Sequence, residues 1–165
     1  MSSFQEQKNQ LLSEAEKLHA RNELSKEIRP DYFEPGMMEY LEQSDAAFEE
    51  STGELMLRFE SKGTRYDGRT EQIEKVNVGD LIRIIRDKDN VYNPNNFRLL
   101  TEKNKDVGNM PAAICNAVAP LYDEGSLLIE SAKVSFVEPI SQRSRHAKQA
   151  ILFVEMKAIF LDSDC

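Results

Sequence analysis

The chain has 165 residues, of which 40% are hydrophobic and 30% charged; this composition is typical of a globular domain that can bury a core. No apolar run approaches the roughly 20 residues that a membrane helix requires, and the N-terminal segment lacks the basic and apolar regions of a signal peptide. We therefore expect an intracellular protein with no membrane partner. Neither the two cysteines nor the two histidines have metal-ligand spacing, so we expect no metal and no cofactor.

The formal net charge of −8 is unusual for a protein that binds phosphates. The charge is unevenly distributed, because residues 1–53 hold 12 acidic and 5 basic side chains, whereas residues 54–165 hold 17 and 16. The acidity therefore belongs to the N-terminal third, and the remainder can carry a local basic patch. We predict an acidic helical extension over residues 1–53 and a β domain over residues 54–165.

The N-terminal third is predicted to be helical. Apolar residues recur at helical spacing between residues 4 and 28, an N-terminal serine can cap the start, and Pro30 ends the helix. After a turn at Pro35-Gly36, a second helix is predicted over residues 37 to about 50. We interpret both as amphipathic helices that dock on the domain or on another subunit.

From Gly53 onward the hydrophobic pattern changes to the two-residue period of β-strands. Leu55, Leu57 and Phe59 alternate with polar residues and predict the first strand. Further strands are predicted at residues 80–87, 96–104, 127–137 and 149–162.

One helix is predicted between the third and fourth of these strands. Asn109 can cap it and Pro111 suits its first position, which would direct Ile114, Val118 and Leu121 toward the core. Five short strands with one helix before the last pair predict an α+β, mainly β fold: a small, partly open barrel of the OB or SH3 type.

Five motifs occur in a fixed order along the β domain: Gly63 to Tyr66, Val78 to Asp87, Asp89 to Phe97, Val107 to Pro111 and Leu121 to Gly125. Their order and spacing resemble the HIRAN domain family, which has an Arg-Tyr pair before its first inner strand, an Asn-x-Tyr-Asp loop and a Gly-x-x-Pro step into a helix. The resemblance covers about residues 55–138, or to 160 at its widest. HIRAN domains occur in helicase-like translocases and as free-standing proteins.

The resemblance implies a modified OB-type barrel that holds the 3′ end of single-stranded DNA. It assigns Tyr66 and Tyr92 to stacking on terminal bases and Arg65 to a phosphate contact. Asn93 stands where the family usually has the aspartate that meets the 3′-hydroxyl, and its amide oxygen can accept a hydrogen bond without the charge assistance of a carboxylate. Without the family, both tyrosines could be half-buried barrel residues and Asn93 only a turn residue.

The segment from Ser141 to Gln149 is basic. It holds Arg143, Arg145 and Lys148 together with His146, and it contains no acidic residue. One interpretation is a solvated hairpin tip, and the other is an electrostatic contact to a DNA backbone that positions the strand without reading its sequence.

No catalytic motif is recognisable in the sequence, so we expect a non-catalytic module for DNA 3′ ends that could serve a helicase or a nuclease. The alternative is a protein-interaction or self-association module that kept the barrel and lost DNA binding, with the acidic helices as its surface. A related hypothesis is that residues 1–53 cover the groove and compete with DNA. The oligomeric state stays open.

Overall fold

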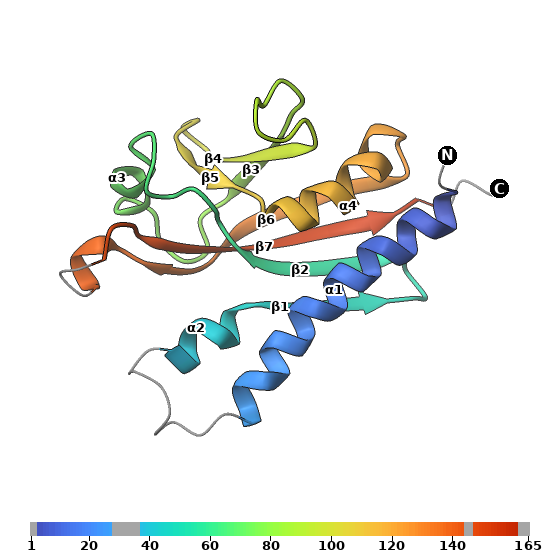
Figure 1. Cartoon of the computed structure of the whole chain (residues 1–165), viewed down its shortest axis with the longest axis horizontal. Coiled ribbons are helices and arrows are strands. Elements are labelled where there is room, and N and C mark those ends of the chain that lie inside the picture. Colours follow the sequence, from blue (N-terminus) through green and yellow to red (C-terminus); the bar gives the residue numbers. More distant parts are fainter. Residues whose placement is uncertain (1–2, 28–36, 144–146, 162–165) are drawn as a thin grey trace.

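The computed structural model describes residues 3–27, 37–143 and 147–161. Its strands form two antiparallel sheets (Figure 1), one with the strand order β1-β2-β7-β6 and the other with the order β3-β4-β5. No helix in the described ranges is long and apolar enough to span a membrane.

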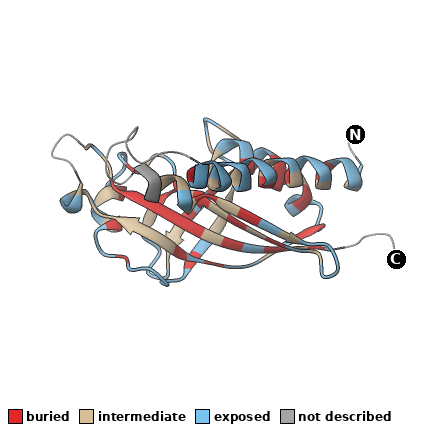
Figure 2. Ribbon diagram, turned by 90° about the horizontal axis from the view of Figure 1, so that it is seen from below, coloured by how far each residue is buried: buried red, intermediate tan, exposed pale blue. Residues whose placement is uncertain are grey.

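The larger sheet forms the main wall of the core. Its strands are β1 (Asp45–Glu49), β2 (Glu54–Glu60), β6 (Leu127–Glu138) and β7 (Ile151–Phe160). On β2 the predicted alternation is confirmed, because Leu55, Leu57 and Phe59 are buried and their neighbours are more exposed. Strand β7 lies between β2 and β6 and is buried along most of its length (Figure 2).

The smaller sheet consists of β3 (Ile82–Asp87), β4 (Asn96–Thr101) and β5 (Asp106–Asn109). Two isolated antiparallel bridges link this sheet to the rest of the chain. Leu81, just before β3, pairs with Lys133 on β6, and Lys62, which follows β2, pairs with Asn109 on β5. The α+β, mainly β prediction is confirmed, and the two sheets do not close into a barrel.

Helix α4 (Ala112–Asp123) packs against the core where the sequence predicted a helix. Ile114, Val118 and Leu121 are buried as expected, and Pro111 occupies the N-cap position, one residue before the helix begins. The short helix α3 (Arg69–Ile73) and the 3₁₀ turn η2 (Ile140–Gln142) were not predicted.

The long helix α1 (Phe4–Glu27) is confirmed, and the hydroxyl of Ser3 accepts a hydrogen bond from the Glu6 amide at its start. It packs against β1, α2 (Met37–Gln43) and α4, and it buries Leu11 and Ala15 in the common core. The predicted proline-glycine turn after α1 lies outside the described residues.

The prediction of a second helix to about residue 50 is wrong beyond α2. Residues 45–49 form β1, an edge strand paired antiparallel with β2. Five residues are too few for an alternating pattern to stand out, and pairing with β2 outweighs their helical propensity. The described part of the acidic N-terminal third therefore contributes two helices, α1 and α2, and one strand, β1.

Candidate functional site

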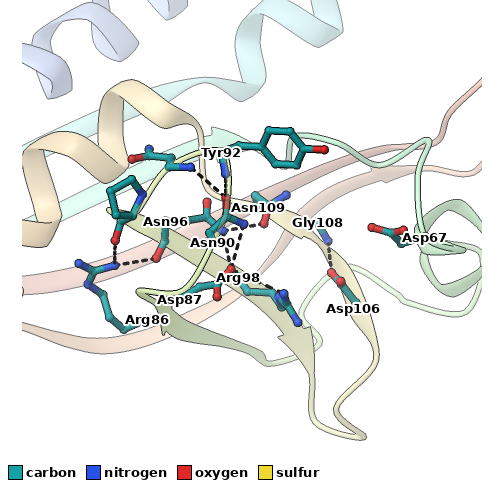
Figure 3. A network of polar contacts seen from close by, with 12 residues as sticks. Asp67, Arg86, Asp87, Asn90, Tyr92, Asn96, Arg98, Asp106, Gly108 and Asn109 are labelled. Carbon is teal, nitrogen blue, oxygen red and sulfur yellow. Dashed lines mark hydrogen bonds and ion pairs between the residues drawn. The ribbon is translucent and has the colours of Figure 1, made fainter.

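Tyr92 lies in the connection between β3 and β4, residues 88–95, here called the Tyr92 loop. Its side chain is 93% exposed and that of neighbouring Val91 is 88% exposed. The side-chain oxygen of Asn90 accepts the backbone N–H groups of Tyr92 and Asn93, each at 3.0 Å. These bonds fix the backbone beneath the tyrosine, whose ring extends away from the hydrogen-bonded cluster (Figure 3).

The base of the Tyr92 loop is held by Asp87. One carboxylate oxygen accepts the amide groups of Asn90 and Asn96, each at 3.1 Å, and Arg98 lies 3.6 Å away. Burial alone would raise the pKa of Asp87, but the two amide hydrogen bonds and the nearby cations together hold this pKa below its ordinary value. The charged carboxylate thus ties both ends of the loop together.

Arg86 provides a second clamp on the same loop. Its Nε and Nη2 donate to the two carboxylate oxygens of Asp123, each at 3.0 Å, and Nη1 donates to the carbonyls of Pro94 at 2.8 Å and Asn96 at 3.1 Å. The guanidinium also lies 5.3 Å from the centre of the Phe97 ring. The hydrogen bonds from Arg86 hold the pKa of Asp123 below its ordinary value.

Asn93, the predicted acceptor for a terminal hydroxyl, is engaged within the loop. Its Oδ1 accepts the backbone N–H of Asn95 at 3.0 Å, and its Nδ2 donates to Oδ1 of Asn116 on α4 at 3.1 Å. Asn95 donates to the same oxygen of Asn116 at 3.2 Å. The loop is thereby docked on α4, and one lone pair of the Asn93 oxygen is already used.

Tyr66 lies in a second connection, residues 62–68, here called the Tyr66 loop. The Tyr66 amide donates to the carbonyl of Gly63 at 3.2 Å, and both Asp67 and Gly68 have left-handed backbone conformations, with φ values of 57° and 72°. The tyrosine side chain is 58% exposed, and the guanidinium of Arg65 lies 5.2 Å from its ring centre. Arg65 and Tyr66, both predicted to contact DNA, thus lie at the surface and contact each other.

Arg69 anchors the Tyr66 loop from below. This buried side chain donates to both carboxylate oxygens of Asp106 at 3.0 and 3.2 Å, and to the carbonyl of Gly63 at 3.0 Å. A bidentate pair of this kind fixes orientation as well as distance. The turn is therefore connected to the start of β5.

Strand β5 connects the two loops. Lys62 and Asn109 exchange backbone hydrogen bonds at 2.9 and 3.0 Å, and Oδ1 of Asn109 accepts the amide of Asn96 at 2.9 Å. Gly108 permits this close approach, because a Cβ there would lie 2.0 Å from Oγ of Ser61 and 2.8 Å from the Lys62 carbonyl. The two exposed tyrosines therefore belong to one hydrogen-bonded framework.

The basic segment from Ser141 to Gln149 is described in part. Arg143 is half-buried, donates to the Gln149 carbonyl at 2.6 Å and lies 4.0 Å from Glu138. Lys148 is exposed, and Arg145 lies outside the described residues. The end of the segment is nevertheless close to the Tyr66 loop, because the Ala150 carbonyl accepts the Thr64 hydroxyl at 2.9 Å.

Sequence reasoning missed the residues that hold the loops, namely Arg69, Arg86, Asn90, Asn109, Asn116 and Asp123. The density of asparagines between residues 90 and 96 signalled turn chemistry, but not which atoms would pair. Arg86 and Asp123 are 37 residues apart, and nothing in the linear pattern connects them. In the described part of the chain, no group of His, Cys, Asp and Glu side chains could hold a metal ion.

A family model described as the HIRAN domain matches residues 55–151, which is more than half of the chain, and the resemblance drawn from the sequence is thereby confirmed. The HIRAN domain of human HLTF is 20% identical, with 64% of this chain and 76% of that chain covered and a TM-score of 0.47. A protein from Lactobacillus plantarum is 17% identical, with 64% and 98% covered and a TM-score of 0.48. No curated protein matches the chain in sequence.

Proposed function

Because this chain belongs to the HIRAN domain family, we propose that it is a non-catalytic module that binds the 3′ end of single-stranded DNA. The observation that carries the proposal is the exposure of Tyr66 and Tyr92, 58% and 93%, on two loops that are held by internal hydrogen bonds. A soluble domain gains nothing for its own stability from an aromatic ring left almost wholly in water. Both rings are available to a ligand.

Base stacking supplies the main binding energy in this proposal. An aromatic side chain contributes roughly 1–3 kcal/mol for each base that it stacks on. Because the loops are already ordered, binding would cost little additional conformational entropy. Arg65 lies against the Tyr66 ring and can hold a phosphate beside the stacked base.

Recognition of the terminal hydroxyl would depend on Asn93. Its amide oxygen accepts one hydrogen bond from Asn95, so one lone pair remains for a ligand hydroxyl. An amide lacks the charge of the family carboxylate, and hydrogen bonds to neutral groups are weaker than those to charged ones. We therefore expect 3′-hydroxyl ends to be preferred over internal strand segments, but by a modest factor.

Fluorescence anisotropy with labelled oligonucleotides at low salt tests this function. The ligands are a single strand with a free 3′-hydroxyl, the same strand with a 3′-phosphate, and a blunt duplex. Tyr66→Ala and Tyr92→Ala should each weaken binding of the first ligand by roughly 5- to 150-fold, the equivalent of one lost stacking contact. Tyr92→Phe and Leu128→Ala are the controls, because the first keeps an aromatic face and the second removes an exposed apolar side chain on β6. Unchanged affinity in both alanine variants would contradict the proposal.

A protein partner is the second candidate, and one observation favours it. Val91 is 88% exposed directly beside Tyr92, and an aliphatic side chain suits an apolar protein surface better than a base. If none of the three oligonucleotides binds the parent chain, the same two tyrosine variants should instead be compared for binding to partner proteins.

A further inference from the structure

A groove lies beside α3, and its lining includes no residue of the Tyr66 loop or the Tyr92 loop. It runs between α3 and the turn that joins β4 to β5, and its volume is about 420 Å³. Its lining combines apolar and basic side chains: Gln72, Lys75, Val76, Asp80, Leu81, Thr101, Glu102, Lys103 and Lys105. The base stacking proposed for Tyr66 and Tyr92 gives this groove no role.

Three lysines give the groove its chemistry. Lys75, Lys103 and Lys105 are exposed, and within the described ranges none of them forms an ion pair with a carboxylate. By contrast, Lys17 and Lys26 each pair with a glutamate on α1. Unpaired ammonium groups at a concave surface attract a polyanion.

The carboxylates of the groove compensate the lysines only in part. Oδ2 of Asp80 accepts the backbone N–H of Asn77 at 2.8 Å and thereby closes a turn. Glu102 is exposed at the rim. The floor is apolar, with Val76 buried and Leu81 53% exposed, so the groove offers a surface for sugars or bases between the cationic groups.

The groove and the Tyr66 loop are connected by α3. From Gly68 to Lys75 the chain advances seven residues in helical and turn conformation, or about 10 Å, which is within a few nucleotides of stacked single strand. On this path Asp106 is paired with Arg69 and Glu74 accepts hydrogen bonds from Ser141, whereas Glu71 on α3 is exposed. The groove is therefore within reach of a strand held at the Tyr66 loop.

We propose that the groove between α3 and the β4–β5 turn binds phosphates of the strand whose 3′ end lies at Tyr66 and Tyr92. This inference rests on the proposed function, and it adds that the ligand is a strand of several nucleotides rather than its terminal bases alone. The contacts are electrostatic and carry no sequence preference.

The test compares oligonucleotides of 3 and 12 nucleotides, both with a free 3′-hydroxyl. Lys103→Ala/Lys105→Ala removes two charges from the groove, and the backbone groups of Lys105 keep their bonds to Thr101. Lys17→Ala/Lys26→Ala removes the same charge from α1 and is the matched control. The groove variant should weaken binding of the longer strand by about threefold or more and reduce its salt slope by about 1.4, as expected for two lost phosphate contacts. Binding of the 3-nucleotide strand should change less than twofold.

Equal affinities and salt slopes for the groove variant and its control would overturn the inference, even if Tyr66→Ala and Tyr92→Ala abolish binding. The opposite result, a groove effect with no tyrosine effect, would retain the phosphate site and reject end recognition by stacking. If the parent chain binds neither strand, both proposals are wrong.

Discussion

The clamp formed by Arg86 offers the most direct perturbation of the Tyr92 loop. Replacing Arg86 with alanine removes two hydrogen bonds to the carbonyls of Pro94 and Asn96, a bidentate pair with Asp123 and the contact of the guanidinium with the Phe97 ring. The carbonyls belong to the far end of the loop, whereas Arg86 itself is on β3. The substitution therefore removes the side chain that holds the far end of the Tyr92 loop to β3.

The magnitude follows from the exposure of each partner. Hydrogen bonds to a charged group contribute about 1.5–3 kcal/mol each, but the loop carbonyls can recover part of this from water. The side chain of Asp123 is 33% exposed, so its lost ion pair counts for about 1 kcal/mol or less. We expect the free energy of unfolding to fall by about 2–4 kcal/mol for Arg86→Ala. The loss should be smaller for Arg86→Lys, because an ammonium keeps the positive charge and can still donate hydrogen bonds, although it cannot reproduce the bidentate fork.

Urea unfolding followed by circular dichroism measures this loss, and Arg98→Ala is the control. The side chain of Arg98 is 45% exposed and makes a single ion pair with Asp87 at 3.6 Å, so its removal should cost less than about 1 kcal/mol. Affinity for the 3-nucleotide strand should fall in Arg86→Ala even where the chain is fully folded, since the loop must then be ordered on binding. Equal stability losses in the two variants would refute the assignment of Arg86 as the clamp.

Three further predictions follow from the framework. Asp87 and Asp123 have lowered pKa values in the folded chain, so their stabilisation is complete above the ordinary aspartate pKa of about 3.9 and is lost as the pH falls through the lower folded values; thermal unfolding should show a melting temperature that declines below about pH 4. Gly108→Ala should cost at least about 3 kcal/mol in urea unfolding, because φ is 122° and Ser61 occupies the space of the new Cβ. Burial raises the pKa of Cys115 to about 11, so iodoacetamide at pH 8 should label Cys115 only in urea, as read by peptide mass spectrometry.

The parts of the fold that could be predicted are those in which one short-range pattern agrees with the tertiary environment. Leu55, Leu57 and Phe59 alternate because β2 has one buried face, and the proline at position 111 stands next to the start of a helix. Strand β1 could not be predicted, because five residues acquire their conformation from pairing with β2. A helix was predicted there because the local pattern alone does not reveal the partner strand.

The candidate site divides in the same way. The family motif predicted Tyr66 and Tyr92, and their exposure agrees with a binding role without testing it. The supporting contacts could not be predicted, since Asn93 meets Asn116 across 23 residues and its oxygen turns back to its own loop. Residue type signals what a side chain can bond to, and only the tertiary arrangement decides which bond is made.

The position of α1 changes how the acidic N-terminal third can be studied. If residues 1–53 covered the groove, deleting them should tighten DNA binding, but Leu11 is fully buried in the core and β1 pairs with β2 along its whole length. A deletion would therefore expose core and strand edge together, and a change in DNA affinity could not be separated from loss of the fold. Charge substitutions on the exposed face of α1, such as Glu16→Gln, alter the acidity and leave the packing intact. If the acidic charge opposes DNA, such variants should bind more tightly, and by a factor that shrinks as salt is added.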